Sequence, residues 1–310
     1  MPKEFLTYQQ QIEKLQRSGL EVADIDACER VLREIGYFPV VNGYQSFFRD
    51  PSTRVYRAGT AFGDIVALYR FDAQVRGITL SALLSVETKL RSALAYEFCK
   101  AHGHEQERYL DASCYGKSRD ARRTLPKLLK MLSSIANVNT DHEYLSHYRT
   151  KYGNVPLWVA VNAMTFGQLS KMYAALGDSD KSKIARRFGA VSAKELGQLV
   201  RVLALFRNVC AHGERLFSHR CHVEIPDMPL HAKLGIARSG PNYTLGKKDL
   251  FAVVIALRYL LSNDEFKVFK ADLSRCISSY VSSDESIGEE RLLAAMGFPP
   301  EWKKITRFKL

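Results

Sequence analysis

The short run from Arg207 to His212 holds side chains that could together cleave RNA without a metal ion. Histidine ionises near neutral pH, so His212 could take the proton from a ribose 2′-OH or give one to the leaving 5′-oxygen. Arg207 could hold the phosphate and stabilise the charge that grows in the transition state, and Asn208 could orient the histidine or the ribose. Attack by the 2′-OH would leave a 2′,3′-cyclic phosphate and a 5′-OH.

A helix must position these side chains, because residues 201–216 follow a helical apolar pattern. At about 100° per residue, the apolar side chains of this run fill one arc of about 160°. Asn208, His212 and Arg215 stack on the opposite side at i, i+4 and i+7, which adds Arg215 to the same polar stripe. Arg207 lies about 140° from His212, where a long side chain can still reach a shared phosphate.

A second polar pair, Glu87 and Arg91, interrupts the apolar face of the helix predicted over 79–101. Charged side chains on a buried face are costly unless they pair with each other or with a neighbouring helix. Two compatible interpretations follow. The pair is an ion pair within one helix that fixes packing, or its carboxylate orients His212 or Arg207 across a helix interface.

An arginine followed five residues later by a histidine is a common pattern, typical on its own of a solvated helix face. The adjacent Asn208 and the nearby Arg215 favour a functional interpretation. A zinc site is the competing use of this region, since two cysteines and three histidines lie between Cys210 and His222. Cys210 belongs to the apolar arc and His212 to the opposite side, so we predict no metal site. No cofactor motif is present, and we expect no cofactor.

The chain is basic, with 45 Lys and Arg residues against 33 Asp and Glu residues and a formal charge of +12. Such an excess favours polyanionic partners, nucleic acid first and an anionic membrane surface second. Basic side chains gather in three runs, and the run between Lys117 and Lys130 contains Arg122 and Arg123. These runs predict a phosphate-binding surface, and we expect RNA as the partner and no membrane.

The start of the chain and its cysteines indicate a cytoplasmic protein. The first residues turn polar at once, without the apolar segment of a secretory signal. The longest apolar run, 251–257, is too short to span a bilayer. The six cysteines are scattered without a CxxC pair, which is typical of reduced core thiols.

A 3.6-residue apolar period dominates from residue 62 onward, which predicts an all-α fold. The expected helices cover 8–18, 24–35, 62–76, 79–101, 119–136, 141–150, 155–163, 165–176, 178–188, 192–215, 247–261, 264–278 and 286–296. The aromatic stretch 36–60 predicts a loop region with one short hairpin. We expect residues 1–60 to form an N-terminal helical extension, either a helix-turn-helix-like module or a clamp packed onto a helical domain of residues 61–310.

Several motifs of the chain occur together in one known family. The run 207–216 reads RNVCAHGERL, and the other motifs are 68–72 with Glu87 and Arg91 behind it, 156–158 leading to 165–170, and 297–299 followed by Trp302. In this order they resemble the bacterial Abi-like proteins of the AbiD/AbiF abortive-infection group, whose signature is RNxxAHxxRL. The ordered set spans most of residues 8–302. The residues around His212 depart from the family, in which many members carry a second histidine, and this puts any auxiliary role of that histidine in doubt.

This resemblance implies a fold and a function. The Abi-like proteins are similar to HEPN-domain ribonucleases, so the fold would be a HEPN-like helical bundle, and Arg207 with His212 would form the RX4–6H motif. The role would be antiphage defence, with RNA cleavage controlled by a small noncoding RNA antitoxin, and a homodimer would bring two motifs together. Asn208 would join the catalytic pair. The residues that would bind RNA or support the site are Arg215, Glu87, Arg91, Arg122 and Arg123.

The sequence leaves two other interpretations open. The same residues could grip a structured noncoding RNA without cutting it, because phosphate binding and phosphate catalysis use the same side chains. A helical scaffold that acts through protein contacts is the third interpretation, and a buried, inaccessible His212 would support it.

Overall fold

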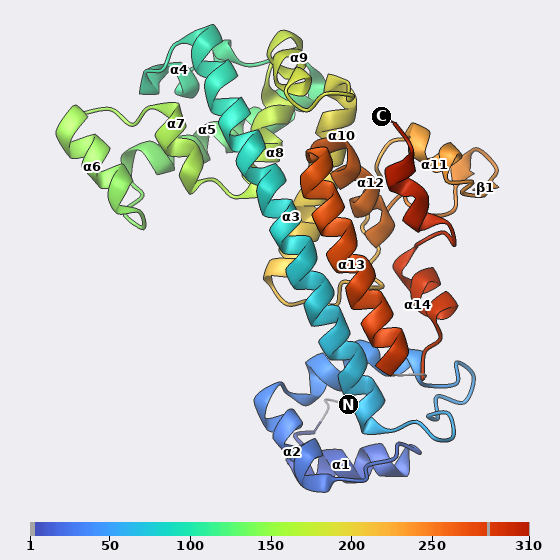
Figure 1. Cartoon of the computed structure of the whole chain (residues 1–310). Coiled ribbons are helices and arrows are strands. Elements are labelled where there is room, and N and C mark those ends of the chain that lie inside the picture. The colour runs from blue at the N-terminus through green and yellow to red at the C-terminus, as the bar shows by residue number, and fades with distance from the viewer. Residues whose placement is uncertain (1–3, 284–285, 310) are drawn as a thin grey trace.

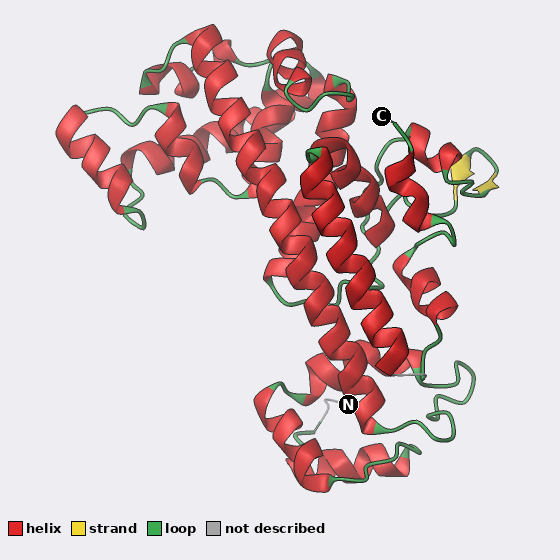
Figure 2. Ribbon diagram, in the orientation of Figure 1, coloured by secondary structure: helices red, strands yellow, loops and turns green. Residues whose placement is uncertain are grey.

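The computed structural model describes residues 4–283 and 286–309, and this part of the chain is almost entirely helical (Figure 2). The α-helices are α1 (Tyr8–Arg17), α2 (Ile25–Glu34), α3 (Phe62–His102), α4 (Gln106–Leu110), α5 (Arg119–Asn137), α6 (Glu143–Tyr152), α7 (Leu157–Ala160), α8 (Phe166–Ala175), α9 (Asp178–Arg186), α10 (Ala193–Ala211), α11 (Pro229–Lys233), α12 (Leu250–Leu260), α13 (Asn263–Ser283) and α14 (Glu289–Met296). Short π- or 3-10 helices are η1 (Phe38–Asn42), η2 (Gln45–Phe47), η3 (Ala112–Cys114), η4 (Val161–Ala163) and η5 (Trp302–Arg307). Strands β1 (Arg238–Ser239) and β2 (Asn242–Tyr243) pair antiparallel. The all-α prediction is confirmed.

Helix α3 is the axis of the molecule, with 41 residues and a length of about 60 Å at the usual rise. In Figure 1 it runs from the N-terminal helices at one end to α4–α7 at the other. Helices α10, α12 and α13 pack against it, and α12 is buried along its whole length. A helix that is apolar all round belongs in the interior of a bundle. The core of the fold is therefore the contact of α3 with α10, α12 and α13.

The expected break between two helices near Gly77 is wrong, because α3 continues through it. A glycine inside a helix costs about 1 kcal/mol relative to alanine, which disfavours a continuous helix without preventing it. Packing of α3 against α10 and α13 outweighs this cost. A Cβ at Gly77 would meet no atom within 4 Å, so the glycine is not required for close packing. The sequence pattern also missed α4 and α11, which at five residues each are too short to show a helical period.

Helix α10 ends earlier than predicted, at Ala211, and His212 is its C-cap residue. Gly213 follows with φ +69°, the left-handed conformation that commonly terminates helices. The chain then turns, and Leu216 and Phe217 enter the core. Arg215 therefore does not extend the helical stripe of Asn208 and His212, which corrects that prediction.

The N-terminal segment packs onto one end of α3. Residues of α1 and α2 belong to the same continuous cluster of buried apolar side chains as α3, and η1 contacts α3. In place of the predicted hairpin, residues 36–60 contain η1, η2 and a single antiparallel bridge between Arg49 and Tyr56. The division of the chain into 1–60 and 61–310 stays a prediction.

Among the helices of residues 4–283 and 286–309, none combines the length and the apolar character needed to cross a bilayer. Even α12, the most apolar of them, has only 11 residues, whereas a membrane span needs about 20.

Candidate functional site

Arg207 on α10 faces Glu87 on α3, as one of the two interpretations of Glu87 predicted. The Arg207 Nε lies 3.4 Å from Glu87 Oε2, while the Arg91 Nη2 donates to Glu87 Oε1 at 2.9 Å. The Glu87 side chain is only 3% exposed and that of Arg207 is 27% exposed. In the described part of the chain, Arg207 Nε and Glu87 Oε2 are both buried and neither has a hydrogen-bond partner, so their contact is an ion pair without a hydrogen bond. The exposed part of the Arg207 side chain lies away from the carboxylate. Arg207 is thus anchored on one side and accessible on the other.

The charges of this cluster do not cancel. One carboxylate lies between two guanidinium groups, which leaves a net charge of +1 in a partly buried place. Arginine keeps its proton under all ordinary conditions, and charges that are partly removed from water act more strongly than exposed ones. The cluster therefore favours an anion at its accessible side.

Asn208 follows Arg207 near the C-terminal end of α10, His212 is the C-cap of that helix, and the side chains of Asn208 and His212 are both exposed. The backbone N–H of His212 donates to the carbonyl of Asn208 at 2.9 Å and closes the last turn. Within the described chain, no hydrogen bond or ion pair joins the His212 side chain to Glu87 or Arg207. The structure thus brings Glu87 to Arg207 but not to His212, and it leaves the imidazole open to solvent.

Asp72 fixes the segment that follows His212, and sequence reasoning missed this role. Its buried carboxylate accepts from the backbone N–H groups of Leu216 at 2.9 Å and Phe217 at 2.7 Å. It also accepts from the Tyr44 hydroxyl at 2.6 Å and the Arg76 guanidinium at 2.7 Å. These four donors tie the chain just after α10 to both α3 and the N-terminal segment.

The Asp72 network is closed by further contacts of Arg76 and Tyr44. Arg76 Nη1 also lies 3.3 Å from the carbonyl of Glu214, so one guanidinium bridges α3 and the turn after His212. Burial raises the pKa of Asp72, and its hydrogen-bond donors oppose that rise. Burial and the adjacent Asp72 raise the pKa of Tyr44, which keeps its hydroxyl protonated as a donor. Tyr44, Asp72 and Arg76 are positioning residues for the end of α10.

A sequence signal for this network exists. Asp72 and Arg76 are four residues apart on an otherwise apolar face of α3, the same pattern that Glu87 and Arg91 show. The pattern does not reveal the partners of Asp72, because two of them are backbone N–H groups and these occur in almost every residue.

Arg215 contacts the N-terminal segment rather than the polar stripe. Its guanidinium donates to the carbonyl oxygen of Gly43, between η1 and η2. The side chain is exposed, and its contact connects two parts of the chain that are distant in sequence.

Arg122 and Arg123 lie apart from the Arg207 cluster, on the exposed face of α5. Helix α5 packs against α8, and α8 in turn packs against α10. Arg122 donates to the carbonyl of Lys117 and Arg123 pairs with Asp120 at 3.3 Å. The structure does not bring these two arginines to the site, so a role for them requires an RNA that reaches across α8.

Two residues of the alternative zinc site, Cys210 and His212, differ in burial as their places on the helix predicted. Cys210 is buried, and burial raises the pKa of its thiol to about 12, whereas His212 is exposed. In the parts of the chain that the structure describes, no three His, Cys, Asp or Glu side chains lie together as a metal site would require.

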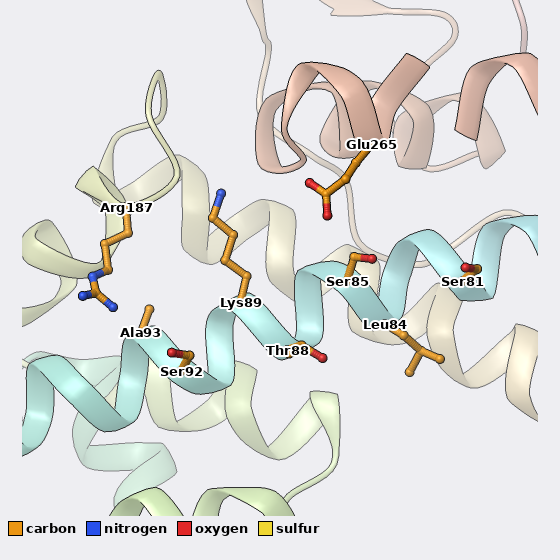
Figure 3. Close-up of a pocket in the computed structure, with 9 residues that line it drawn as sticks. All are labelled: Ser81, Leu84, Ser85, Thr88, Lys89, Ser92, Ala93, Arg187 and Glu265. Atoms are coloured by element: carbon orange, nitrogen blue, oxygen red, sulfur yellow. The ribbon is translucent and has the colours of Figure 1, made fainter. Parts of the chain in front are cut away.

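An open groove runs along the exposed side of α3 next to the site. Figure 3 shows its hydroxyl side chains, with Lys89 and Arg187 on one side of α3 and Glu265 of α13 pointing toward the helix. This part of the groove encloses about 770 Å³. A second hollow of about 810 Å³ continues it toward α7 and shares Thr88 and Ser92 with it. Arg91 lines the second hollow, so the groove reaches the Glu87 cluster.

Replacement of Glu87 by glutamine is expected to lower the free energy of unfolding by about 1–3 kcal/mol, the usual cost of leaving a buried hydrogen-bonding group without its partner. It leaves the guanidinium groups of Arg91 and Arg207 adjacent without a counter-charge. Urea denaturation measures the change.

Glu13→Gln is the matched control, because Glu13 pairs with Arg17 at the same i,i+4 spacing and the same 2.9 Å but on the surface of α1. We expect at most about 0.5 kcal/mol there. Equal effects of the two substitutions would show that Glu87 does not hold the arginines in place.

Comparison with protein-family models identifies the family of the chain. The family model described as Abi-like protein matches residues 30–218, which is more than half of the chain. The protein therefore belongs to the Abi-like protein family. The match includes Asp72, Glu87, Arg207 and His212, while the resembling motif at 297–302 lies outside it. No curated protein and no solved structure matches the chain.

Proposed function

We propose that this Abi-like protein is a metal-independent endoribonuclease in which Arg207, Asn208 and His212 are the catalytic residues. The observation that carries the proposal is the position of both an anchored arginine and an exposed histidine near the end of one helix. Glu87 holds Arg207 at 3.4 Å, and Asp72 holds the backbone that follows His212. Fixing the Arg207 side chain and the backbone next to His212 favours catalysis, because a misplaced group loses most of its effect.

The reaction follows from the chemistry of these groups. The imidazole of His212 takes the proton of a ribose 2′-OH, and the 2′-oxygen attacks the adjacent phosphorus. The bond from phosphorus to the 5′-oxygen breaks, and that oxygen leaves with a proton from the solvent or from a protonated imidazole. Arg207 stabilises the additional negative charge on the phosphate oxygens, and the amide of Asn208 orients the ribose. The products are a 2′,3′-cyclic phosphate and a 5′-OH.

The family also suggests a biological role for the protein. Membership in the Abi-like family suggests a role in abortive-infection defence. We propose further that the bundle is HEPN-like, that the protein is of the AbiD/AbiF type, and that a small noncoding RNA restrains it in the cytoplasm until infection. A homodimer would place two Arg207 and His212 pairs near each other.

RNA that is isolated with the protein from its host tests this function. Sequencing of that RNA with mapping of its ends is expected to show cleaved fragments with wild-type protein and intact RNA with His212→Ala. Intact RNA with both proteins would contradict cleavage.

The second candidate function is RNA binding without cleavage. It is favoured by the net positive Glu87 cluster, which attracts a phosphate whether or not the phosphate reacts. Stable, uncut RNA that is released by Arg207→Ala would support this function in place of the first.

A further inference from the structure

The second hollow of the groove combines exposed aromatic rings with cations. Its volume is about 810 Å³, and it lies between α3 and the segment α7–η4. The aromatic and larger polar side chains that line it are Arg91, Tyr96, Lys100, His104, Trp158 and Asn162. Three of its lining residues are basic and none is acidic. The residues that line the hollow therefore place no negative charge against an anionic ligand.

Two of the aromatic side chains are about half exposed. Tyr96 is 54% and Trp158 is 47% exposed, so both rings are accessible to a ligand. Two cations lie over the ring of Tyr96: the Arg187 guanidinium is 4.6 Å and the Lys100 ammonium is 5.9 Å from the ring centre. His104 lies 5.6 Å from the ring of Trp158. Each ring is thus partly exposed and has a positive or ionisable group in contact with it.

The groove is connected to the proposed cleavage site through one residue. Arg91 lines the groove and also holds Glu87, whose other oxygen faces Arg207. From Arg91 to Lys100 the helix rises about 14 Å, the length of roughly four stacked bases. A strand in this groove would therefore enter the Arg207 site at one end.

We propose that this groove binds a single-stranded segment of RNA, with bases stacked on Tyr96 and Trp158 and phosphates at Arg91 and Lys100. Exposed rings beside cations are the arrangement with which proteins hold single strands, because every base has a face that can stack and every nucleotide has a phosphate. A duplex does not fit this description, since its bases are already stacked on each other. The proposal deepens the proposed function and rests on it for the identity of RNA as the substrate.

Intrinsic fluorescence tests the stacking directly. The chain has two tryptophans, and Trp302 is fully buried, so a ligand in the groove changes the emission of Trp158. The probe is a short single-stranded oligoribonucleotide with 2′-O-methyl groups, which cannot be cleaved by attack of the 2′-oxygen. We expect saturable quenching with the single strand and little with the same sequence as a duplex. Unchanged emission at concentrations where the oligonucleotide binds would overturn the proposal.

Affinity measurements with a labelled oligonucleotide test the two rings separately. Tyr96→Ala and Trp158→Ala are each expected to weaken binding roughly 5- to 150-fold, the value of one stacked base, while Trp158→Phe should retain most of the affinity. Tyr152→Ala is the matched control, because Tyr152 is 56% exposed and has the Lys151 ammonium 5.3 Å from its ring but lies outside the groove. Equal affinities of the Tyr96, Trp158 and Tyr152 variants would contradict a stacking site.

The salt dependence of oligonucleotide binding tests the role of the positive charges in the groove. Lys100→Gln should reduce the slope of log affinity against log salt by about 0.7, the loss of one phosphate contact to a single strand. Because the probe cannot be cut, this result is independent of catalysis. If quenching and salt dependence are as expected while unmodified RNA stays intact, binding of single-stranded RNA in the groove is supported and the cleavage proposal fails. If a protein partner rather than RNA protects Trp158, the RNA proposal itself is wrong.

Discussion

Replacement of His212 by alanine is expected to lower the rate of RNA cleavage by about 10²–10⁴-fold, the usual contribution of a positioned general acid or base. His212 is exposed at the C-cap of α10, so the substitution removes a reactive group without opening a cavity, and the free energy of unfolding should hardly change. Single-turnover cleavage of a labelled RNA measures the rate. His222→Ala is the control, because His222 is also exposed and lies outside α10.

Arg207→Ala should reduce the same rate by about 10²–10³-fold, as expected for a lost donor to the transition-state charge. Arg201→Ala removes an exposed arginine from the same helix and should leave the rate nearly unchanged. A loss of affinity for RNA without a loss of the cleavage rate at saturation would assign Arg207 to binding alone.

Asp72→Ala is expected to lower the free energy of unfolding by about 3–5 kcal/mol, the cost of removing one partner of a buried ion pair. The substitution leaves the buried Arg76 guanidinium without its carboxylate and two backbone N–H groups without an acceptor. This is a large part of the 5–15 kcal/mol that stabilises a typical protein. The midpoint of urea denaturation measures the change.

Two further variants define the cause of that effect. Asp72→Asn keeps the shape and an acceptor oxygen, so we expect a smaller loss than with alanine, together with slower RNA cleavage because the turn after His212 loosens. Asp272 pairs with Arg275 on the surface of α13, and Asp272→Ala should change stability by at most about 1 kcal/mol. An Asp72→Ala protein as stable as Asp272→Ala would show that the network does not hold the end of α10.

The sequence predicts most helices and the polar end of α10, because apolar periodicity is a local property. Helix α10 shows the principle and its limit. The pattern places Asn208 and His212 on its polar side and Cys210 on its apolar side, as observed. The pattern does not detect that Gly213 adopts φ +69° and ends the helix before Arg215. A glycine is tolerated inside a helix, as Gly77 in α3 shows, and only its packing environment decides between the two outcomes.

The contacts between distant parts of the chain are less predictable. That Glu87 sits on a buried face follows from its spacing, and the need for a partner follows from the cost of burying charge. The identity of the partner as Arg207 depends on the register of α3 against α10, which no local pattern contains. Asp72 is harder still, because half of its partners are backbone groups. The groove at Tyr96 and Trp158 combines residues 62 positions apart and exists only in the folded chain.

The chemistry of the cleaved RNA ends tests the central claim most directly. Purified protein is incubated with a defined RNA in excess chelator, beside the His212→Ala variant, and the new ends are identified by enzymatic treatment and mass spectrometry. Attack by the 2′-OH predicts a 2′,3′-cyclic phosphate on one fragment and a 5′-OH on the other, formed by the wild-type protein and not by the variant. Fragments that carry a 3′-OH and a 5′-phosphate, or equal cleavage by both proteins, would contradict the assignment of Arg207 and His212 as a ribonuclease site.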